Sequence, residues 1–285
     1  MFYDRQTKQL IEHVEYKQKT LHFLYNTTCG RILLKLFIAR PWLSRLYGLY
    51  QKSKLSQKDI LPFAKKYNIQ IDEEYIQAKY MCFNDFFIRH KTINTEYNSA
   101  NFLISPADSK LNIYHIDSEL SFAIKNSIYN IEDLLQDKNL ANDFKGGYCL
   151  VFRLCVDDYH RYHFIDDGRL ISHKHIKGEL HTVRPISEKY NVYTRNTREI
   201  SILDTNNLGR VVYVEVGALL VGKIHNHEKQ NFKRFEEKGY FEFGGSTIVL
   251  LLNKNIKFDS DIIEANNLGY EVKVCTGEPI GQIEE

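Results

Sequence analysis

The sequence predicts an α+β protein in which N-terminal amphipathic helices pack on a predominantly β-sheet core. Between Leu21 and Tyr50, apolar residues recur at spacings of three and four and are interleaved with Arg and Lys, which is the pattern of amphipathic helices. We expect these helices to be interrupted at Gly30 and Pro41. From about residue 100 onward, short alternating runs separated by Gly, Asp and Asn are typical of strands joined by turns.

Local patterns predict the individual elements. Ser56 begins a helix that ends near Asn68, and a second short helix covers residues 73–80. Asn130 is the expected N-cap of a helix over residues 131–136. The expected strands cover residues 110–116, 148–156, 169–176, 210–216 and 219–224, together with the uninterrupted apolar run 248–252, which indicates a buried strand.

At 285 residues the chain is long enough to bury a large core. We divide it into a helical segment, residues 1–80, and a β-rich domain, residues 81–285. Its five cysteines include no Cys-x-x-Cys pair, so we expect a reducing compartment and neither a disulfide framework nor a zinc knuckle. No signal peptide is expected, and the best candidate for a membrane span, residues 32–39, is too short.

Positive charge is concentrated at the N-terminus. Residues 1–70 carry thirteen Lys or Arg against four Asp or Glu, a net charge of +9, whereas the whole chain carries +2 and the remainder therefore −7. A basic helix with an aromatic-bearing apolar face is typical of segments that lie in a membrane interface. The alternative is a helix packed on the core with Lys and Arg reaching into solvent. Nucleic acid is disfavoured because the basic residues alternate with apolar ones instead of forming a polar groove.

The segment Phe243-Gly244-Gly245-Ser246-Thr247 lies directly before the apolar run. Two glycines permit backbone conformations closed to other residues, so Ser246 is expected where a strained turn enters a rigid strand. Taken alone, such a segment is usually only a hairpin turn. A classical serine hydrolase is disfavoured because its nucleophile elbow needs glycine at position 248, which is Ile248.

Two further segments contain groups suited to acid–base chemistry. Asp108 follows Pro106 in a turn just before a strand, although most such aspartates bond only their own turn. His160 and His163 are three residues apart at the end of a buried strand, with Arg161 between them, a combination that suits acid–base work on an anion. The chain order Asp108, His163, Ser246 is compatible with a triad, because triads are defined by geometry.

Paired histidines raise a metal alternative. His173 and His175, with Glu179 four residues further on, are similar to the first metal motif of cupins, and His225 and His227 have the same spacing. The Gly-rich stretch and the later histidine that should follow the cupin motif are missing. We therefore expect no bound metal and interpret these histidines as solvent-facing.

Six motifs, in order, resemble those of the phosphatidylserine decarboxylases, pyruvoyl-dependent enzymes of phospholipid synthesis in their prokaryotic proenzyme form. The resemblance covers essentially the whole chain. This sequence departs from the family at Gly244, where most members have Leu, and at Ser109, where most have Gly. The motifs are Phe83-Asn84-Asp85-Phe86-Phe87-Ile88-Arg89, Ser105-Pro106-Ala107-Asp108, Tyr159-His160-Arg161-Tyr162-His163, Asn196 to Glu199, Val216-Gly217-Ala218 with Val221-Gly222, and Gly244-Gly245-Ser246-Thr247.

The resemblance implies that the chain cuts itself. Ser246 Oγ would attack the carbonyl carbon of Gly245, with His163 as the base and Asp108 orienting it. β-Elimination of the resulting ester and loss of ammonia would leave a covalent pyruvoyl group, the cofactor, at position 246. The products would be a β chain of residues 1–245 and an α chain of residues 246–285.

The resemblance also implies the reaction and its setting. Phosphatidylserine would form a Schiff base with the pyruvoyl group, lose CO2 and leave as phosphatidylethanolamine, with His160 as proton donor and Arg161 unassigned. Such a carboxy-lyase would be peripheral to the cell membrane on its cytoplasmic side, with an anionic membrane surface as partner, and a homodimer is expected because members are commonly dimeric. The alternatives are a membrane-binding homologue that never cuts itself and a cupin-like metalloenzyme that uses His173 and His175.

Overall fold

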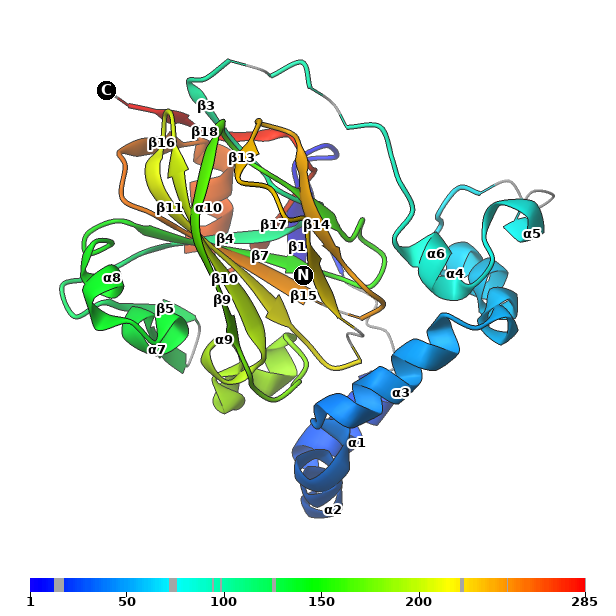
Figure 1. Ribbon diagram of the computed structural model, residues 1–285. Coiled ribbons are helices and arrows are strands. Elements are labelled where there is room, and N and C mark those ends of the chain that lie inside the picture. The colour runs from blue at the N-terminus through cyan, green and yellow to red at the C-terminus, as the bar shows by residue number, and fades with distance from the viewer. Residues whose placement is uncertain are drawn as a thin grey trace.

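The computed structural model describes residues 1–12, 18–71, 76–93, 95–97, 99–124, 127–220, 223–244 and 246–284. It is an α+β structure, as predicted, with one large sheet and helices around it (Figure 1). The helices are α1 (Gln18–Asn26), α2 (Thr28–Leu33), the π-helix η1 (Leu34–Ile38), α3 (Pro41–Gln51), the 3-10 helix η2 (Lys54–Asp59), α4 (Ile60–Lys66), α5 (Ile76–Lys79), α6 (Phe83–Phe87), α7 (Ile131–Leu135), α8 (Lys138–Asn142), the 3-10 helix η4 (Pro185–Tyr190), α9 (Val192–Arg195) and α10 (Ser260–Asn267).

Strands make up most of the chain after residue 100, as the alternating runs predicted. The expected strands at 110–116, 148–156, 169–176, 210–216 and 248–252 are confirmed as β4, β7, β9, β11 and β15. The strands are β1 (Phe2–Asp4), β2 (Gln9–Ile11), β3 (Phe102–Ile104), β4 (Ser109–His115), β5 (Ser121–Ile124), β6 (Ser127–Asn130), β7 (Tyr148–Leu154), β8 (Arg161–His163), β9 (Gly168–Ile176), β10 (Arg198–Thr205), β11 (Gly209–Gly217), β12 (Ile224–Asn226), β13 (Asn231–Phe232), β14 (Glu237–Phe241), β15 (Ser246–Leu252), β16 (Ile256–Phe258), β17 (Glu271–Val274) and β18 (Pro279–Ile283).

The main sheet has ten strands in the order β13-β9-β10-β11-β15-β7-β4-β17-β1-β2. Its pairs are antiparallel except for β1 with β17, which joins the first strand of the chain to one of the last in parallel. β15 lies between β11 and β7, and all seven of its residues are buried. Because both faces of β15 are covered, its sequence is a continuous apolar run instead of an alternating one.

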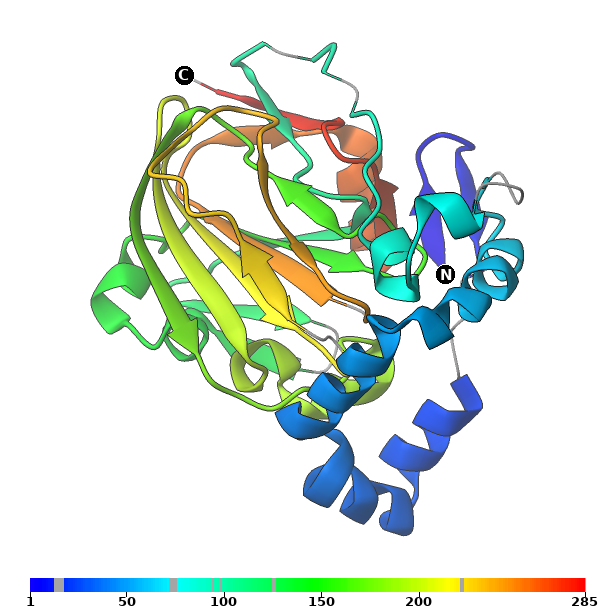
Figure 2. The same ribbon diagram turned by 45° about the vertical axis from the view of Figure 1, so that its right-hand side comes forward.

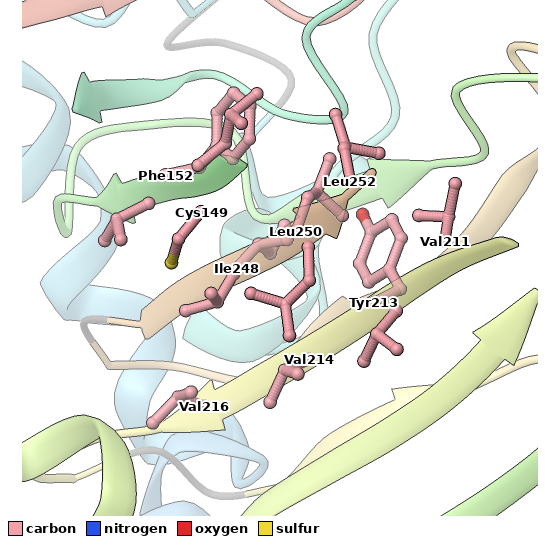
Figure 3. Close-up of a cluster of buried hydrophobic side chains, with 14 of the residues drawn as sticks. Cys149, Phe152, Val211, Tyr213, Val214, Val216, Ile248, Leu250 and Leu252 are labelled. Carbon is pink, nitrogen blue, oxygen red and sulfur yellow. The ribbon is translucent and has the colours of Figure 1, made fainter. Parts of the chain in front are cut away.

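The core lies on both sides of these central strands. Ile248 and Leu250 of β15 pack with side chains of β11 and β7, among them Val214 and Cys149 (Figure 3). On one face, the small sheet β12-β14-β8 covers β11, where the rings of Tyr162 and Tyr213 are 6.1 Å apart.

The opposite face of the sheet is covered by α7. The guanidinium of Arg198, in β10, donates to the carbonyl oxygens of Leu134 (2.8 Å) and Asp133 (3.0 Å) of this helix. The predicted N-cap of α7 is confirmed, since Asn130 Oδ1 accepts from Glu132 N at 2.6 Å.

The N-terminal helices α1, α2 and α3 lie to one side of the main sheet (Figures 1 and 2). Pro41 is the first residue of α3, as predicted, because its ring fits the first helical turn. The expected interruption at Gly30 is wrong: the break falls at Thr27, whose side chain accepts from Gly30 N and caps α2. Gly30 is needed instead for close packing, since a Cβ there would come 2.1 Å from Phe23 O.

Two other local expectations are wrong. Only Ile224 of the expected strand 219–224 lies in a strand, Leu219 and Leu220 form a turn, and residues 221 and 222 lie outside the described residues. Ser56 lies inside η2 and does not cap α4; its Oγ donates to Gln51 O at 2.9 Å. The division at residue 80 stays a prediction, and the segment before it contributes the strands β1 and β2 as well as helices.

Replacing Leu250 by Ala should lower the free energy of unfolding by about 2–5 kcal/mol, because it leaves a cavity in a fully buried strand. Urea denaturation followed by circular dichroism measures this change. Leu268→Ala is the matched control, because Leu268 is 74% exposed and its loss should change stability by less than about 0.5 kcal/mol. Equal effects of the two substitutions would contradict the central position of β15.

Candidate active site

Ser246 is the first residue of β15 and is fully buried. It lies opposite Gly217 of β11 on one side and Leu154 of β7 on the other. Gly244 has a φ of 141°, which L residues rarely adopt, so the turn before the strand depends on glycine as the sequence predicted. Gly245, the expected partner of Ser246 in the cleaved bond, lies outside the described residues.

Ser246 Oγ lies within hydrogen-bond distance of the His160 side chain. Its Nδ1 lies 3.4 Å from Ser246 Oγ, and its Nε2 lies 2.8 Å from Cys155 O. A carbonyl oxygen only accepts hydrogen bonds, so Nε2 carries the proton and Nδ1 is free to accept from the serine hydroxyl. Burial lowers the pKa of His160 to about 3, so the ring is neutral near pH 7.

Helix α6 holds both His160 and the turn before Ser246. The ring of Phe87 stacks on His160, with centroids 4.2 Å apart, and also contacts Phe243 at 5.0 Å. Asn84 Oδ1 accepts a hydrogen bond from Phe243 N at 3.3 Å. The aromatic side chains of α6 are therefore part of a buried core that includes Phe243, and they also fix two components of the site.

Asp108 lies in a cluster with Lys91 and Thr276. Lys91 Nζ is 2.5 Å from each carboxylate oxygen of Asp108, while Thr276 donates from N and from Oγ1, each at 2.8 Å. The sequence did not single out Lys91 or Thr276. Thr276 is 168 positions from Asp108, so only the tertiary structure could bring them together.

His163 is attached to the same turn as Asp108, through its backbone N, which donates to Pro106 O at 3.0 Å. Its Nδ1 is buried and has no hydrogen-bond partner among the described residues. The ring of Tyr159 lies parallel to that of His163 with centroids 6.3 Å apart, and Lys91 Nζ lies 4.9 Å from the Tyr159 centroid. Burial lowers the pKa of His163 to about 4.

The structure thus pairs Ser246 with His160, and places His163 beside the turn that carries Asp108. The relay from Asp108 through His163 to Ser246 stays a prediction. Arg161, which the sequence left unassigned, has a structural role: its Nε donates to Ile88 O at 2.6 Å and its guanidinium pairs with Glu237 at 2.7 Å, so it ties the end of α6 to β14.

The two histidine pairs contact carboxylates. His173 and His175 both contact Glu199, at 2.9 and 2.7 Å. His225 contacts Glu242 at 2.6 Å and His227 contacts Glu237 at 2.7 Å. Within the described part of the chain, no group of three His, Cys, Asp or Glu side chains could hold a metal ion.

A mostly apolar cavity of about 240 Å³ reaches the turn before Ser246. The N-terminal helices supply one wall, including Leu24 and Leu43, and the core supplies the other, including Val156, Phe243 and Gly244. The cavity therefore adjoins the turn that leads into the buried serine.

Comparison with known proteins agrees with the geometry. The family model described as phosphatidylserine decarboxylase matches residues 83–282. A phosphatidylserine decarboxylase proenzyme 2 of Clostridium acetobutylicum is 50% identical, over 98% of this chain and 97% of its own length. Phosphatidylserine decarboxylase proenzymes of Clostridium kluyveri and Clostridium tetani are 42% and 41% identical, over 98% and 99% of this chain and 98% and 97% of their own lengths. The chain therefore belongs to the phosphatidylserine decarboxylase family.

Proposed function

We propose that this chain cuts itself between Gly245 and Ser246 and then converts phosphatidylserine to phosphatidylethanolamine and CO2, using a pyruvoyl group made from Ser246. The observation that carries the proposal is the 3.4 Å contact between the buried Ser246 hydroxyl and Nδ1 of His160. The chain that contains this contact belongs to the decarboxylase family, and its relatives are named proenzymes.

Self-cleavage begins with transfer of the Ser246 proton. A serine hydroxyl is a weak nucleophile and needs an adjacent base. The unprotonated Nδ1 of His160 is placed to take this proton in the uncut chain. The family resemblance implies a different base, His163 oriented by Asp108. For that role Asp108 would have to exchange its contact with Lys91 for a contact with the His163 imidazole.

The remaining steps balance without an added oxidant or reductant. Ser246 Oγ bonds to the carbonyl carbon of Gly245 as the C–N bond breaks, which converts an amide to an ester. Loss of the Cα proton of residue 246 then expels the carboxylate of Gly245 and leaves dehydroalanine. Its imine form takes up water and releases ammonia, which leaves the pyruvoyl group at the start of β15.

Thr247 Oγ1, on the residue directly after position 246, is buried without a hydrogen-bond partner among the described residues, and so is Nδ1 of His163 in β8. Such atoms can donate to the carbonyl oxygens of a pyruvoyl group. When formed, the group would supply a carbonyl for the serine amine and an electron sink for the electrons left by CO2. His160, fixed by Phe87 and Cys155 O, presents Nδ1 to position 246, and this nitrogen would pass to carbon a proton that it takes up during turnover.

Membrane docking is the second part of the proposal. Large apolar side chains of the N-terminal helices are exposed next to the exposed basic residues Arg31, Lys35 and Arg40. These apolar residues are Phe23, Ile32, Leu33, Leu36, Phe37, Trp42, Leu46 and Leu49. Among the described residues, no helix has both the length and the hydropathy needed to cross a bilayer. An exposed apolar face with basic neighbours fits a protein that lies on an anionic membrane surface.

Intact-mass spectrometry under denaturing conditions should show a fragment of residues 246–285 that is one ammonia lighter than its sequence. Ser246→Ala should give only the full-length mass, because it lacks the attacking oxygen. Ser172→Ala, a change at an exposed serine of β9, should be cut like the wild type. A single full-length mass for the wild type would instead favour the membrane-binding homologue that never cuts itself.

Self-cleavage should tolerate mild acid. The pKa of His160 is lowered to about 3 and that of His163 to about 4, so both stay neutral bases down to about pH 5. The cleavage rate of proenzyme made in a cell-free pulse, followed on gels, should therefore change less than about twofold between pH 7.5 and 5.5. An ordinary histidine would lose about nine-tenths of its basic form over the same range, so a tenfold fall in rate would contradict the buried, neutral base.

Replacing Leu46 and Leu49 by Gln should reduce co-sedimentation with vesicles of phosphatidylcholine and phosphatidylglycerol, because these side chains are 55% and 66% exposed on α3. Loss of two leucine side chains that would be buried in the bilayer should lower the membrane partition constant about tenfold or more. Ile171→Gln with Leu268→Gln is the matched control, since those side chains are 53% and 74% exposed but lie in β9 and after α10. Equal binding of both variants would contradict docking through α3.

A further inference from the structure

A second cavity, lined by several charged side chains, runs between α3 and the end of the main sheet. This groove has a volume of about 810 Å³ and is distinct from the apolar cavity. Its cationic side chains are Arg45 of α3, Lys52 directly after α3, Lys177 directly after β9, and Lys223 directly before β12. Two carboxylates, Glu199 and Glu242, also line it.

Among the described residues, three of these cations have no counter-ion. Lys52 pairs with Glu242 at 2.7 Å, and Glu199 is occupied by His173 and His175. Within the described ranges, Arg45, Lys177 and Lys223 form no ion pair with a carboxylate. Like charges gathered in one groove repel one another, so an anionic ligand would be stabilised there.

The groove extends from the membrane-docking helix to the strand position beside Ser246. Leu49, which is 66% exposed on α3, lines its outer end. Gly217 lines its inner end and pairs directly with Ser246 in the sheet. A Cβ at Gly217 would lie 3.1 Å from Thr197 Cγ2, so a larger side chain would fill this end.

Helix α3 separates two environments that together suit an amphiphile. Leu43 faces the apolar cavity, whereas Arg45 and Leu49 face the cationic groove. A lipid with its apolar chains in the first environment also carries a phosphate, which the cations of the second would attract. Arg and Lys are the residues that bind phosphate oxygens, Arg through its planar fork and Lys as a compact charge.

We propose that Arg45, Lys177 and Lys223 form a binding site for the phosphodiester of a glycerophospholipid at the membrane surface. The proposal rests on the proposed lipid-decarboxylase function and names contacts for the part of the lipid that does not react. The phosphodiester belongs either to the substrate or to a neighbouring anionic lipid, and the same three cations would bind it in both cases.

The test compares two triple variants with the same loss of charge. R45Q/K177Q/K223Q removes the groove cations, and K138Q/K145Q/K257Q removes three exposed cations on α8, after α8 and on β16, across the sheet from α3 in Figure 1. Both should be cut to completion in the intact-mass spectrum and keep the wild-type melting temperature. R45K is a milder variant, because it keeps the positive charge at position 45 but loses the planar guanidinium that can bind two phosphate oxygens.

Decarboxylation is measured in mixed micelles of neutral detergent and phosphatidylserine. Membrane binding of the protein is measured by co-sedimentation with phosphatidylcholine vesicles that contain phosphatidylglycerol. The groove variant should raise the apparent KM for phosphatidylserine about tenfold with kcat within about twofold, because charged hydrogen bonds to the phosphate are lost without change at Ser246. A raised KM with unchanged vesicle binding assigns the site to the substrate. Weaker vesicle binding with unchanged KM assigns it to a neighbouring anionic lipid.

The proposal is overturned if the groove variant matches the distal variant in both measurements. Failure of the proposed function has a different signature: the wild type itself would stay uncut or release no CO2 in the micelle assay. Vesicle binding needs neither self-cleavage nor decarboxylation, so weaker vesicle binding by the groove variant than by the distal variant would still show that the groove cations bind lipid phosphate.

Discussion

The position of Ser246 at the entrance to a fully buried central strand is the constraint on which the rest of the structure depends. From Ser246 onward the backbone of β15 is paired on both sides, with β11 and with β7. A bond cut just before this strand would leave its new end held by two ladders. In the segment after the cut, β17 would also stay paired between β4 and β1. Its carboxylates Asp259, Asp261 and Glu278 would keep their ion pairs with Arg5. The proposed cleavage therefore need not release the α chain.

Burial also sets the chemistry of the two histidines. Removing an imidazole from water disfavours its charged form, so His160 and His163 stay neutral where free histidines would begin to protonate. A neutral ring alone would not suffice, because it must also present the correct nitrogen. Cys155 O fixes the proton on Nε2 of His160, and Phe87 fixes the plane of the ring.

The N-terminal helices connect this buried site to its proposed substrate. A two-chain lipid remains at the bilayer, so an enzyme that acts on it must work at the surface. α3 has an exposed apolar edge. One side of the helix lines an apolar cavity, and another side lines a cationic groove. The apolar surfaces suit acyl chains, and the cations of the groove suit a phosphate.

Local patterns were enough to predict the α+β class, the buried strand 248–252, the start of α3 at Pro41 and the segments that contain Asp108, His160, His163 and Ser246, because periodicity and motifs are local properties of the chain. They did not place the break between α1 and α2 at Thr27, where a side-chain cap on Gly30 N accompanies close packing of Gly30 against Phe23. Only the tertiary structure decided that His160 is the side chain at Ser246 Oγ, and that Lys91 and Thr276 occupy the carboxylate of Asp108. These partners lie far apart in the chain, and their distances follow from how the sheets and α6 pack, which no local pattern records.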